Sequence, residues 1–420
     1  MRALRLIGIM ALILTLTLGS CSTSVAPAES QRVVIGFTAS QSGTYRVESQ
    51  EQVQGLQLWA EQVNAQGGIK AGAALIQVEL KFYDDASNKD QVTTLYGKLV
   101  TEDRVDYLIS PYSSGLAAAA AAVAEQNGKL LIAAGAATDS LFGKGYQHAF
   151  QVYTPASRYL TGAVDMLRKA DPQATRIAIL YEDESFAASV ATAAEEYAGR
   201  QGLQVVMFDK YPPGTTDFAA WLDQLPALEV DALLGGGHSA DSTALAQQLA
   251  DRKAPLKLVS LLVAPALPEF ANIGAAARYM TGPSQWEPQV GYSAAGAQTQ
   301  DAPFYGPSVS EFTQAYTTRY GYAPGYHAAG GYAAGLILQR GIETAGTTDQ
   351  QSIERALEQI SLLTFFGRIK FDAGSLHGLQ IGHEMVYLQW QQAGSGELNK
   401  QVIWPEAGRS APLQYPRQVP

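Results

Sequence analysis

Short apolar runs alternate along the chain with longer stretches in which apolar residues recur every three or four positions. The pattern is clearest between residues 104 and 138, where an apolar run, a turn of small hydroxyl-bearing residues, an alanine-rich stretch and a second apolar run follow one another. Alanine costs less in a helix than any other residue, so this order predicts strand, turn, helix and strand. These segments are Val105–Ser110, Pro111–Gly115, Leu116–Glu125 and Leu130–Ala134. Such a unit predicts a parallel sheet with a right-handed crossover.

The same alternation fills two successive parts of the chain and predicts an α/β protein with two similar lobes. Pro155 blocks a helix where we expect the chain to pass between lobes, and Tyr279–Pro307 has no clear period, so a second passage is expected there. Further strands are predicted at Arg32–Phe37, Leu75–Tyr83, Arg176–Tyr181, Gln204–Tyr211, Ala232–Leu234, Leu256–Leu262, Phe365–Phe371 and Glu384–Gln391. Further helices are predicted at Val47–Val63, Asn88–Thr101, Arg158–Lys169, Ala187–Gln201, Phe218–Leu225, Ser242–Ala250, Ser308–Tyr320, Gly330–Ala345 and Gln350–Leu363.

The N-terminus has the pattern of a bacterial lipoprotein signal. Two arginines precede the apolar stretch Leu6–Leu18, which is too short to span a bilayer comfortably, and Leu-Gly-Ser-Cys21 follows at once. We therefore expect residues 1–20 to be a signal peptide, Cys21 to carry lipid, and residues 21–31 to form a flexible tether. An ordinary signal peptide with a chance cysteine is the alternative. Both alternatives predict a protein located outside the cytoplasm. The lipoprotein signal also predicts that lipid anchors it to the cell membrane.

Composition narrows the class of protein further. The chain has 420 residues, enough for two domains, and a net charge of −10 with no basic cluster, which argues against a nucleic-acid partner. Cys21 is its only cysteine, so an intrachain disulfide is excluded. We find no G-x-S-x-G elbow, P-loop or G-x-G-x-x-G, and His383-Glu384 does not continue as the zinc motif H-E-x-x-H. We therefore expect neither an enzyme nor a metal or cofactor.

The residues that could bind a ligand lie where predicted strands end. Ser113 and Ser114 stand between a strand and a helix, where unpaired N–H groups and the helix dipole favour an anionic group. Thr138 follows the next strand, at the same edge of the sheet. Ligands of open α/β sheets bind at that edge, so the sequence predicts an anion-binding site there. Alternatively, Ser113 or Ser114 only caps the helix.

The ordered set of motifs resembles the type I periplasmic-binding-protein family, specifically the branched-chain amino acid (Leu/Ile/Val) binding proteins of ABC importers. The motifs are Ile35-Gly36-Phe37 with Ser42-Gly43, Asn64–Ile69, Tyr83–Ser87, Pro111–Gly115, Gly135–Thr138 and Phe366–Asp372. The resemblance implies two Rossmann-like lobes with parallel central sheets, joined by a hinge of three crossovers. It assigns residues 32–152 plus about 287–366 to lobe 1 and residues 153–286 plus about 367–405 to lobe 2, with 406–420 as an irregular tail.

The resemblance also implies a small-molecule ligand, delivered by a monomer to ABC permease and ATPase subunits; a ligand-sensing subunit of a receptor is the alternative. Ser114 aligns with a serine that binds the ligand carboxylate. Ala136 and Thr138 align with residues that hold the carboxylate and ammonium groups. Gly237 departs from the family, which often has an aromatic residue there. The other candidate ligand residues are Tyr45, Tyr112, Ser113, Phe186, His238, Trp286 and Tyr326.

A larger departure concerns the partner of a ligand ammonium. The family's amino-acid binders place an acid after the strand at 256–262, but Ser260, Leu261, Leu262 and Val263 are not acidic. Because a buried ammonium without a counter-charge is costly, we expect a carboxylate ligand without an α-amine, such as an aromatic or aliphatic acid. A Leu/Ile/Val-type amino-acid binder is the alternative, with Glu182, Asp183 or Glu287 as the displaced acid.

Overall fold

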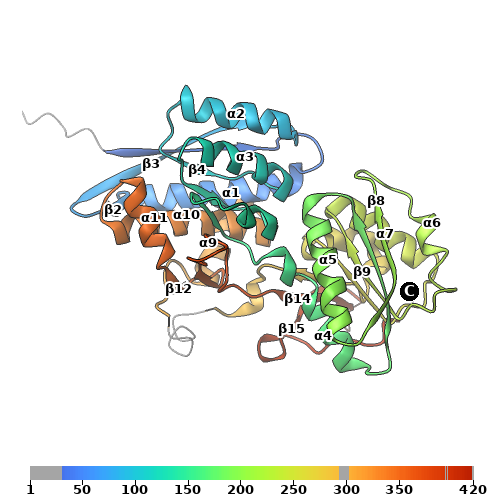
Figure 1. The fold of residues 1–420 in the computed structure, drawn as a ribbon. Helices are drawn as coiled ribbons and strands as arrows, with labels where there is room; N and C mark the ends of the chain where they lie inside the picture. Colours follow the sequence, from blue (N-terminus) through green and yellow to red (C-terminus); the bar gives the residue numbers. More distant parts are fainter. Residues whose placement is uncertain (1–30, 293–301, 393, 395, 419–420) are drawn as a thin grey trace, which may run out of the picture. The chain divides into compact units, whose positions relative to one another are not determined.

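The structure is a computed structural model that describes residues 31–292, 302–392, 394 and 396–418. The signal sequence and Cys21 lie outside these residues, so their predicted roles stay predictions. Within the described ranges, no helix combines the length and the apolar character needed to cross a membrane. The chain forms two α/β lobes, each built around its own sheet (Figure 1).

The first lobe has a six-stranded sheet in the order β2-β3-β1-β4-β5-β6. Every neighbouring pair is parallel except β2 and β3, which form an antiparallel hairpin at one edge. The central strands β4 and β5 are buried throughout, as expected for strands covered on both faces. The strands are β1 (Arg32–Ala39), β2 (Ile69–Ala71), β3 (Ala74–Asp84), β4 (Tyr107–Ile109), β5 (Leu131–Ala133) and β6 (Ala149–Gln151).

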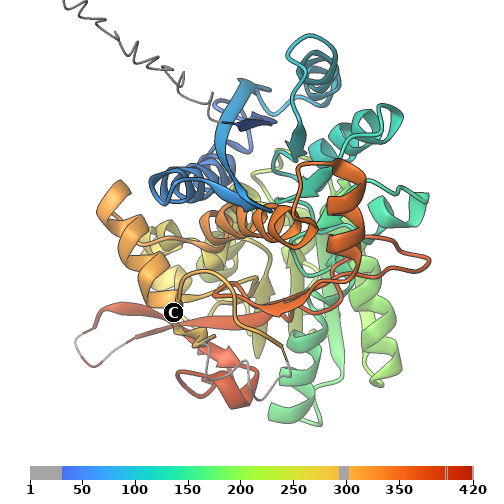
Figure 2. The ribbon, with the colours of Figure 1, turned by 90° about the vertical axis from the view of Figure 1, so that its left-hand side faces the viewer.

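Two long helices of this lobe, α1 and α10, pack closely against each other. Helices α1 and α10 lie side by side in both views, and glycines let their backbones approach (Figure 1, Figure 2). A Cβ atom at Gly55 would lie 1.9 Å from Ala328 O, and one at Gly331 would lie 2.0 Å from Gln52 O. The helices of this lobe are α1 (Arg46–Ala65), α2 (Lys89–Thr101), α3 (Ser114–Gln126), α9 (Val309–Tyr320), α10 (Tyr326–Ala345) and α11 (Gln350–Glu358).

The second lobe has a seven-stranded sheet in the order β15-β14-β11-β10-β9-β7-β8. Strands β7 to β11 pair in parallel with one another, whereas β14 pairs antiparallel with β11 and β15 pairs antiparallel with β14. The strands are β7 (Arg176–Glu182), β8 (Gln204–Tyr211), β9 (Ala232–Gly236), β10 (Leu258–Leu261), β11 (Thr281–Ser284), β14 (Val386–Gln392) and β15 (Leu398–Trp404). The helices are α4 (Thr161–Ala170), α5 (Ser185–Arg200), α6 (Ala219–Leu222) and α7 (Ser239–Asp251).

The chain passes between the two sheets three times: after β6, after β11 and before β14. The three connecting segments meet at one hydrogen-bonded cluster, which we call the hinge cluster: Thr154, Gln285 and His383. Thr154 N donates to Gln285 Oε1 at 2.9 Å, and the Thr154 hydroxyl lies 2.6 Å from His383 Nδ1. His383 Nε2 bonds Phe366 O at 2.9 Å. The hinge is therefore held by polar atoms that all have partners.

Several boundaries differ from those predicted, and two of them change how the late part of the chain is assigned. The predicted helix Gln350–Leu363 ends at Glu358, and β12 (Ser361–Leu363) follows because its residues pair with β13 (Arg368–Lys370). The segment after residue 367, assigned by resemblance to lobe 2, joins β12 and β6 instead: Gly378 O accepts a bond from Gln151 N at 2.9 Å. The chain re-enters the second sheet only at β14. The short strands β6 and β11 and the seven-residue strand β15 were not predicted.

Candidate ligand-binding site

A small cavity lies where the carboxyl ends of strands from both sheets face each other. The first lobe contributes the loop after β4, the start of α3 and the loop after β5, and the second contributes the starts of α5 and α7. The cavity leaves about 10 Å³, roughly the room needed for one water molecule. Its lining residues are Tyr112, Ser113, Ser114, Gly135, Ala137, Tyr153, Tyr159, Phe186, His238 and Tyr326. Most of its surface is therefore aromatic, with a few polar groups.

The serines on the first-lobe wall do not serve as helix caps. Ser113 precedes α3 but makes no capping bond with its side chain, and its buried hydroxyl has no hydrogen-bond partner among the described residues. Ser114 Oγ instead accepts bonds from the N–H groups of Ala137 at 3.1 Å and Thr138 at 3.2 Å. This arrangement places two hydroxyls at the N-terminus of α3, where the helix dipole favours an anion, and ties the loop after β5 to Ser114.

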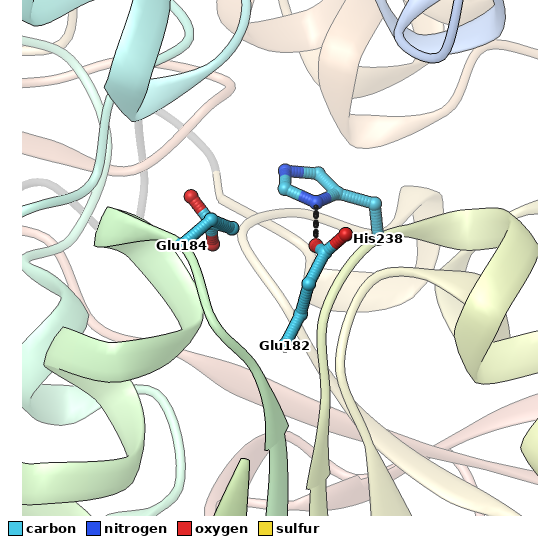
Figure 3. Close-up of side chains that lie close together, drawn as sticks. All are labelled: Glu182, Glu184 and His238. Carbon is cyan, nitrogen blue, oxygen red and sulfur yellow. Dashed lines mark hydrogen bonds and ion pairs between the residues drawn. The ribbon is translucent and has the colours of Figure 1, made fainter. Parts of the chain in front are cut away.

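The second-lobe wall is an ion pair between Glu182, at the end of β7, and His238, just after β9 (Figure 3). His238 Nδ1 lies 2.7 Å from Glu182 Oε2, and both side chains are buried. Burial alone lowers the pKa of His238, but the bond to Glu182 and the charges of Glu184, Glu182 and Glu48 outweigh it and raise that pKa to about 9. At neutral pH His238 is therefore an imidazolium.

The other ring nitrogen of His238, Nε2, has no partner in the part of the chain that the structure describes. Figure 3 shows this nitrogen on the side of the ring away from Glu182. Because His238 lines the cavity and is protonated on both nitrogens, it presents a charged donor to any group that enters.

Glu182, Glu184 and His238 also form a cluster whose possible metal-ligand atoms lie within 4.8 Å of one another. Each of these atoms has another role. Glu184 is the N-cap of α5, and its carboxylate accepts bonds from Phe186 N at 2.9 Å and Ala187 N at 2.5 Å. Glu182 is bonded to His238 Nδ1. The geometry is that of a helix cap beside an ion pair.

Sequence reasoning missed three acceptors on α1. Glu48, Glu51 and Gln52 are all buried, and each has one side-chain oxygen without a partner among the described residues. Glu48 Oε1 accepts a bond from Ser239 of the second lobe at 2.6 Å, and Gln52 Nε2 donates to Ser110 O at 2.8 Å. The sequence alone does not show that this polar face of α1 is covered in the fold.

The acids that the sequence offered as ammonium partners are already paired. Glu182 holds His238. Asp183 is half exposed and lies 2.9 Å from Lys210 Nζ. Glu287 is buried with Lys400 Nζ 2.8 Å away, and burial raises the pKa of its carboxyl. A ligand ammonium at any of the three would have to displace an existing partner.

The structure brings most of the predicted residues together. Tyr112, Ser113, Ser114, Phe186, His238 and Tyr326 all line the cavity. Tyr45 lies beside it, with its ring centroid 4.8 Å from that of His238 and 5.9 Å from that of Tyr112. Thr138 and Ala136 lie behind the wall: the Thr138 hydroxyl is 3.0 Å from Ser189 Oγ across the lobes, and Ala136 O accepts a bond from Gln151. Tyr153 and Tyr159, which sequence reasoning did not single out, complete the lining.

Trp286 is placed elsewhere. Its side chain is fully buried, its indole N–H donates to Phe365 O at 2.9 Å, and its ring meets those of Phe312 and Phe365 edge-on. It does not line the cavity. We therefore remove Trp286 from the candidate ligand residues and assign it to packing beside the hinge.

Comparison with known proteins agrees with this architecture. Residues 32–395 match the family model described as periplasmic binding protein. A Leu/Ile/Val-binding protein homolog 7 from Brucella suis is 24% identical over 96% of this chain and 99% of its own length. The solved structure of a leucine-binding protein from Thermotoga maritima has a TM-score of 0.73 at 19% identity, covering 89% of this chain and 99% of that one.

A second solved structure, a solute-binding protein of an ABC transporter from R. palustris in complex with 4-hydroxybenzoate, has a TM-score of 0.72 at 17% identity, covering 93% of this chain and 98% of that one. These TM-scores show that both structures share the overall fold of this chain. The chain therefore belongs to the periplasmic-binding-protein family and has its type I fold.

Proposed function

We propose that this protein is the solute-binding component of an ABC importer and captures a small carboxylate-bearing ligand between its two lobes, outside the cytoplasm. The observation that carries the proposal is the convergence of donors from both lobes on one cavity. Ser113 and Ser114 come from the first lobe and the His238 imidazolium from the second. Charge-assisted bonds of this kind are the stronger ones that a carboxylate can accept.

The rest of the lining supports an apolar ligand body. Tyr112, Tyr153, Tyr159, Phe186 and Tyr326 surround the polar groups, and aromatic rings bury a flat or branched apolar group well. Solved structures of similar fold agree with this composition of the cavity, because three of them are complexes with isoleucine, benzoate and 4-hydroxybenzoate. We infer that the ligand here has a carboxylate at one end and an apolar body.

The small free volume supports binding by lobe movement. The remaining space holds about one water molecule, so a ligand as large as leucine or benzoate enters only if the walls move apart. Contacts across the lobes, such as the bonds from Ser239 to Glu48 and between Ser189 and Thr138, would break as it enters and re-form around it. The hinge cluster is the natural pivot because all three connecting segments meet there.

We further propose that lipid on Cys21 anchors the protein and that ABC permease and ATPase subunits receive its ligand. The signal pattern before Cys21 supports the anchor, and the family supports the partners. Mass spectrometry of protein extracted from membranes tests the anchor: we expect an N-terminus at Cys21 that carries lipid. An unmodified N-terminus that starts elsewhere would contradict it.

The test of the main proposal is a thermal-shift screen with L-leucine, L-phenylalanine, benzoate and 4-hydroxybenzoate, followed by calorimetry on the compounds that stabilise the protein. We expect at least one carboxylate to bind. Small-angle scattering at saturation should then show a change in the radius of gyration. An unchanged radius would rule out lobe movement, and binding of none of the four acids would contradict the proposed ligand class.

A further inference from the structure

We propose that Glu48 of α1 fastens the closed lobes by binding Ser239 of the second lobe, and that this contact sets how fast a bound ligand leaves. The inference rests on the proposed function and adds a residue that does not touch the ligand, because Glu48 does not line the cavity. We call Tyr45, Glu48, His238 and Ser239 together the latch.

The latch joins the first turns of two helices from different lobes. Tyr45 is the N-cap of α1, and Glu48, three residues further on, is its neighbour on that turn. His238 is the N-cap of α7, and Ser239 is the first residue of that helix. Ser239 Oγ donates to Glu48 Oε1 at 2.6 Å, and the ring centroids of Tyr45 and His238 lie 4.8 Å apart. Two adjacent contacts therefore connect the lobes at one point.

The carboxylate of Glu48 lies where positive potential from both lobes meets. It belongs to the first turn of α1 and binds the first turn of α7, so the positive ends of two helix dipoles act on it. His238, on the same turn of α7, is an imidazolium at neutral pH. Glu48 is 0% exposed, so solvent ions screen these attractions little. The attractions from the second lobe act on Glu48 only when the lobes are closed.

Each end of the latch is held by its own lobe. Tyr45 N donates to Ser87 Oγ at 3.1 Å, which fixes the start of α1 against the loop after β3. His238 N donates to Asp241 Oδ1 at 2.8 Å, which fixes the start of α7. Because neither end can follow the other lobe without losing these bonds, opening the lobes must break the latch.

Another bond between the lobes is built differently. Thr138 Oγ1 lies 3.0 Å from Ser189 Oγ, and both groups are neutral hydroxyls. Each has a further partner in its own lobe, Ser140 Oγ at 3.0 Å and Ser185 O at 2.8 Å, respectively. Opening therefore leaves both hydroxyls bonded, whereas Glu48 Oε1 loses the one partner that it has among the described residues. Bonds to a charged group are also roughly twice as strong as neutral ones.

A latch of this kind has a kinetic signature. It closes after the ligand has entered, so its loss should speed dissociation and leave association nearly unchanged. Stopped-flow mixing of the full chain with whichever of L-leucine, L-phenylalanine, benzoate and 4-hydroxybenzoate binds tightest measures both rates. Ser239→Ala removes the donor and should raise the dissociation rate about tenfold, with the association rate within about twofold of the wild type.

Two further variants test the assignment. Glu48→Gln keeps an acceptor oxygen but removes the charge, so it should raise the dissociation rate less, by about threefold. The double variant should dissociate no faster than Ser239→Ala, because both changes remove the same contact. The matched control is Ser189→Ala, which removes the neutral hydroxyl of the other bond and should change the dissociation rate less than about twofold.

The outcomes separate the latch from the proposed function. If an acid binds but Ser239→Ala dissociates as slowly as the wild type, or no faster than Ser189→Ala, the latch is refuted and the proposed function stands. Slower association in place of faster dissociation would also refute it, since it would place Ser239 in the open site. Binding of none of the four acids would overturn both. Ser239→Ala and Glu48→Gln change opposite ends of one bond, so either variant tests it if the other folds poorly.

Discussion

The hinge cluster and the ligand cavity are both buried and polar, yet they differ in how their polar atoms are used. At the hinge, Thr154 N, Thr154 Oγ1 and both nitrogens of His383 all have partners. At the cavity, Ser113 Oγ and His238 Nε2 have none among the described residues. A hinge must keep its geometry while the lobes move, whereas a binding site must keep atoms available for its ligand. Two unpaired buried donors therefore distinguish the cavity from the hinge cluster.

His383 at the hinge and His238 at the cavity show the same contrast in their charge. Burial lowers the pKa of His383 to about 4, although its bond to Phe366 opposes this change, so His383 is neutral at pH 7. The pKa of His238 is raised to about 9 by its acidic neighbours, against the effect of burial. A neutral, fully bonded imidazole suits a structural joint, and a charged imidazole with a free N–H suits recognition of an anion.

The largest expected effect is on the cavity's ion pair. His238→Leu leaves Glu182 buried without its partner and should lower the free energy of unfolding by about 3–5 kcal/mol, measured by denaturant titration. The double variant His238→Leu with Glu182→Leu is the control, and it should recover most of that loss because two apolar residues replace the pair. A single variant as stable as the wild type would show that the pair is not buried as described.

The pH dependence of stability should separate the two histidines. The folded-state pKa of His238 is above its ordinary value of 6.5, so its contribution is present below pH 6.5 and is lost as pH rises through about 9; the difference corresponds to about 3 kcal/mol. The folded-state pKa of His383 is below 6.5, so its contribution is present above pH 6.5 and is lost as pH falls towards 4.

Urea titrations at several pH values measure both slopes. His238→Gln should flatten the alkaline side only, and His383→Gln the acidic side only. If His238→Gln left the alkaline side as steep as in the wild type, another group would have to carry that charge.

A smaller effect is expected on ligand affinity at the first-lobe wall. Ser114→Ala removes a hydroxyl that gathers the N–H groups of Ala137 and Thr138, so it should weaken binding of the tightest acid in the screen about tenfold. The unfolding free energy should fall by about 1–3 kcal/mol, because the buried N–H groups of Ala137 and Thr138 lose their acceptor. Calorimetry and denaturant titration measure the two effects. Unchanged affinity would mean that the carboxylate binds elsewhere.

The smallest effect on ligand affinity is expected beside the hinge, at Trp286. Trp286→Phe removes the bond to Phe365 O and should cost about 1–3 kcal/mol of stability, because that carbonyl is left buried. Ligand affinity should stay within about twofold, since the tryptophan does not line the cavity. A large loss of affinity with little loss of stability would return Trp286 to the ligand site.

The sequence predicted candidate site residues well where a strand ends or a helix begins. It did not predict which side chains are buried by segments that are distant in the sequence. Ser113, Ser114 and Tyr112 were found because a strand end and a helix start mark the carboxyl edge of a parallel sheet. Glu48 and Glu51 were missed because burial of their helix face depends on α10 and the second lobe, far away in the sequence.

The wrong expectation for Trp286 has a similar cause. Tyr279–Pro307 has no period from which to place a side chain, and the indole packs against Phe312 and Phe365, which come much later in the chain. The boundary near residue 367 was missed because the strands β12 and β13 are three residues long and gain their order only by pairing with each other.

The most direct test of the account is a crystal structure of the protein with the tightest-binding acid from the screen. We predict ligand density between the lobes, with the carboxylate within hydrogen-bond distance of both Ser114 Oγ and His238 Nε2. Density at another surface, or a ligand in the cavity whose carboxylate contacts neither residue, would contradict the central claim that donors from the two lobes, the Ser114 hydroxyl and the His238 N–H, form the binding site.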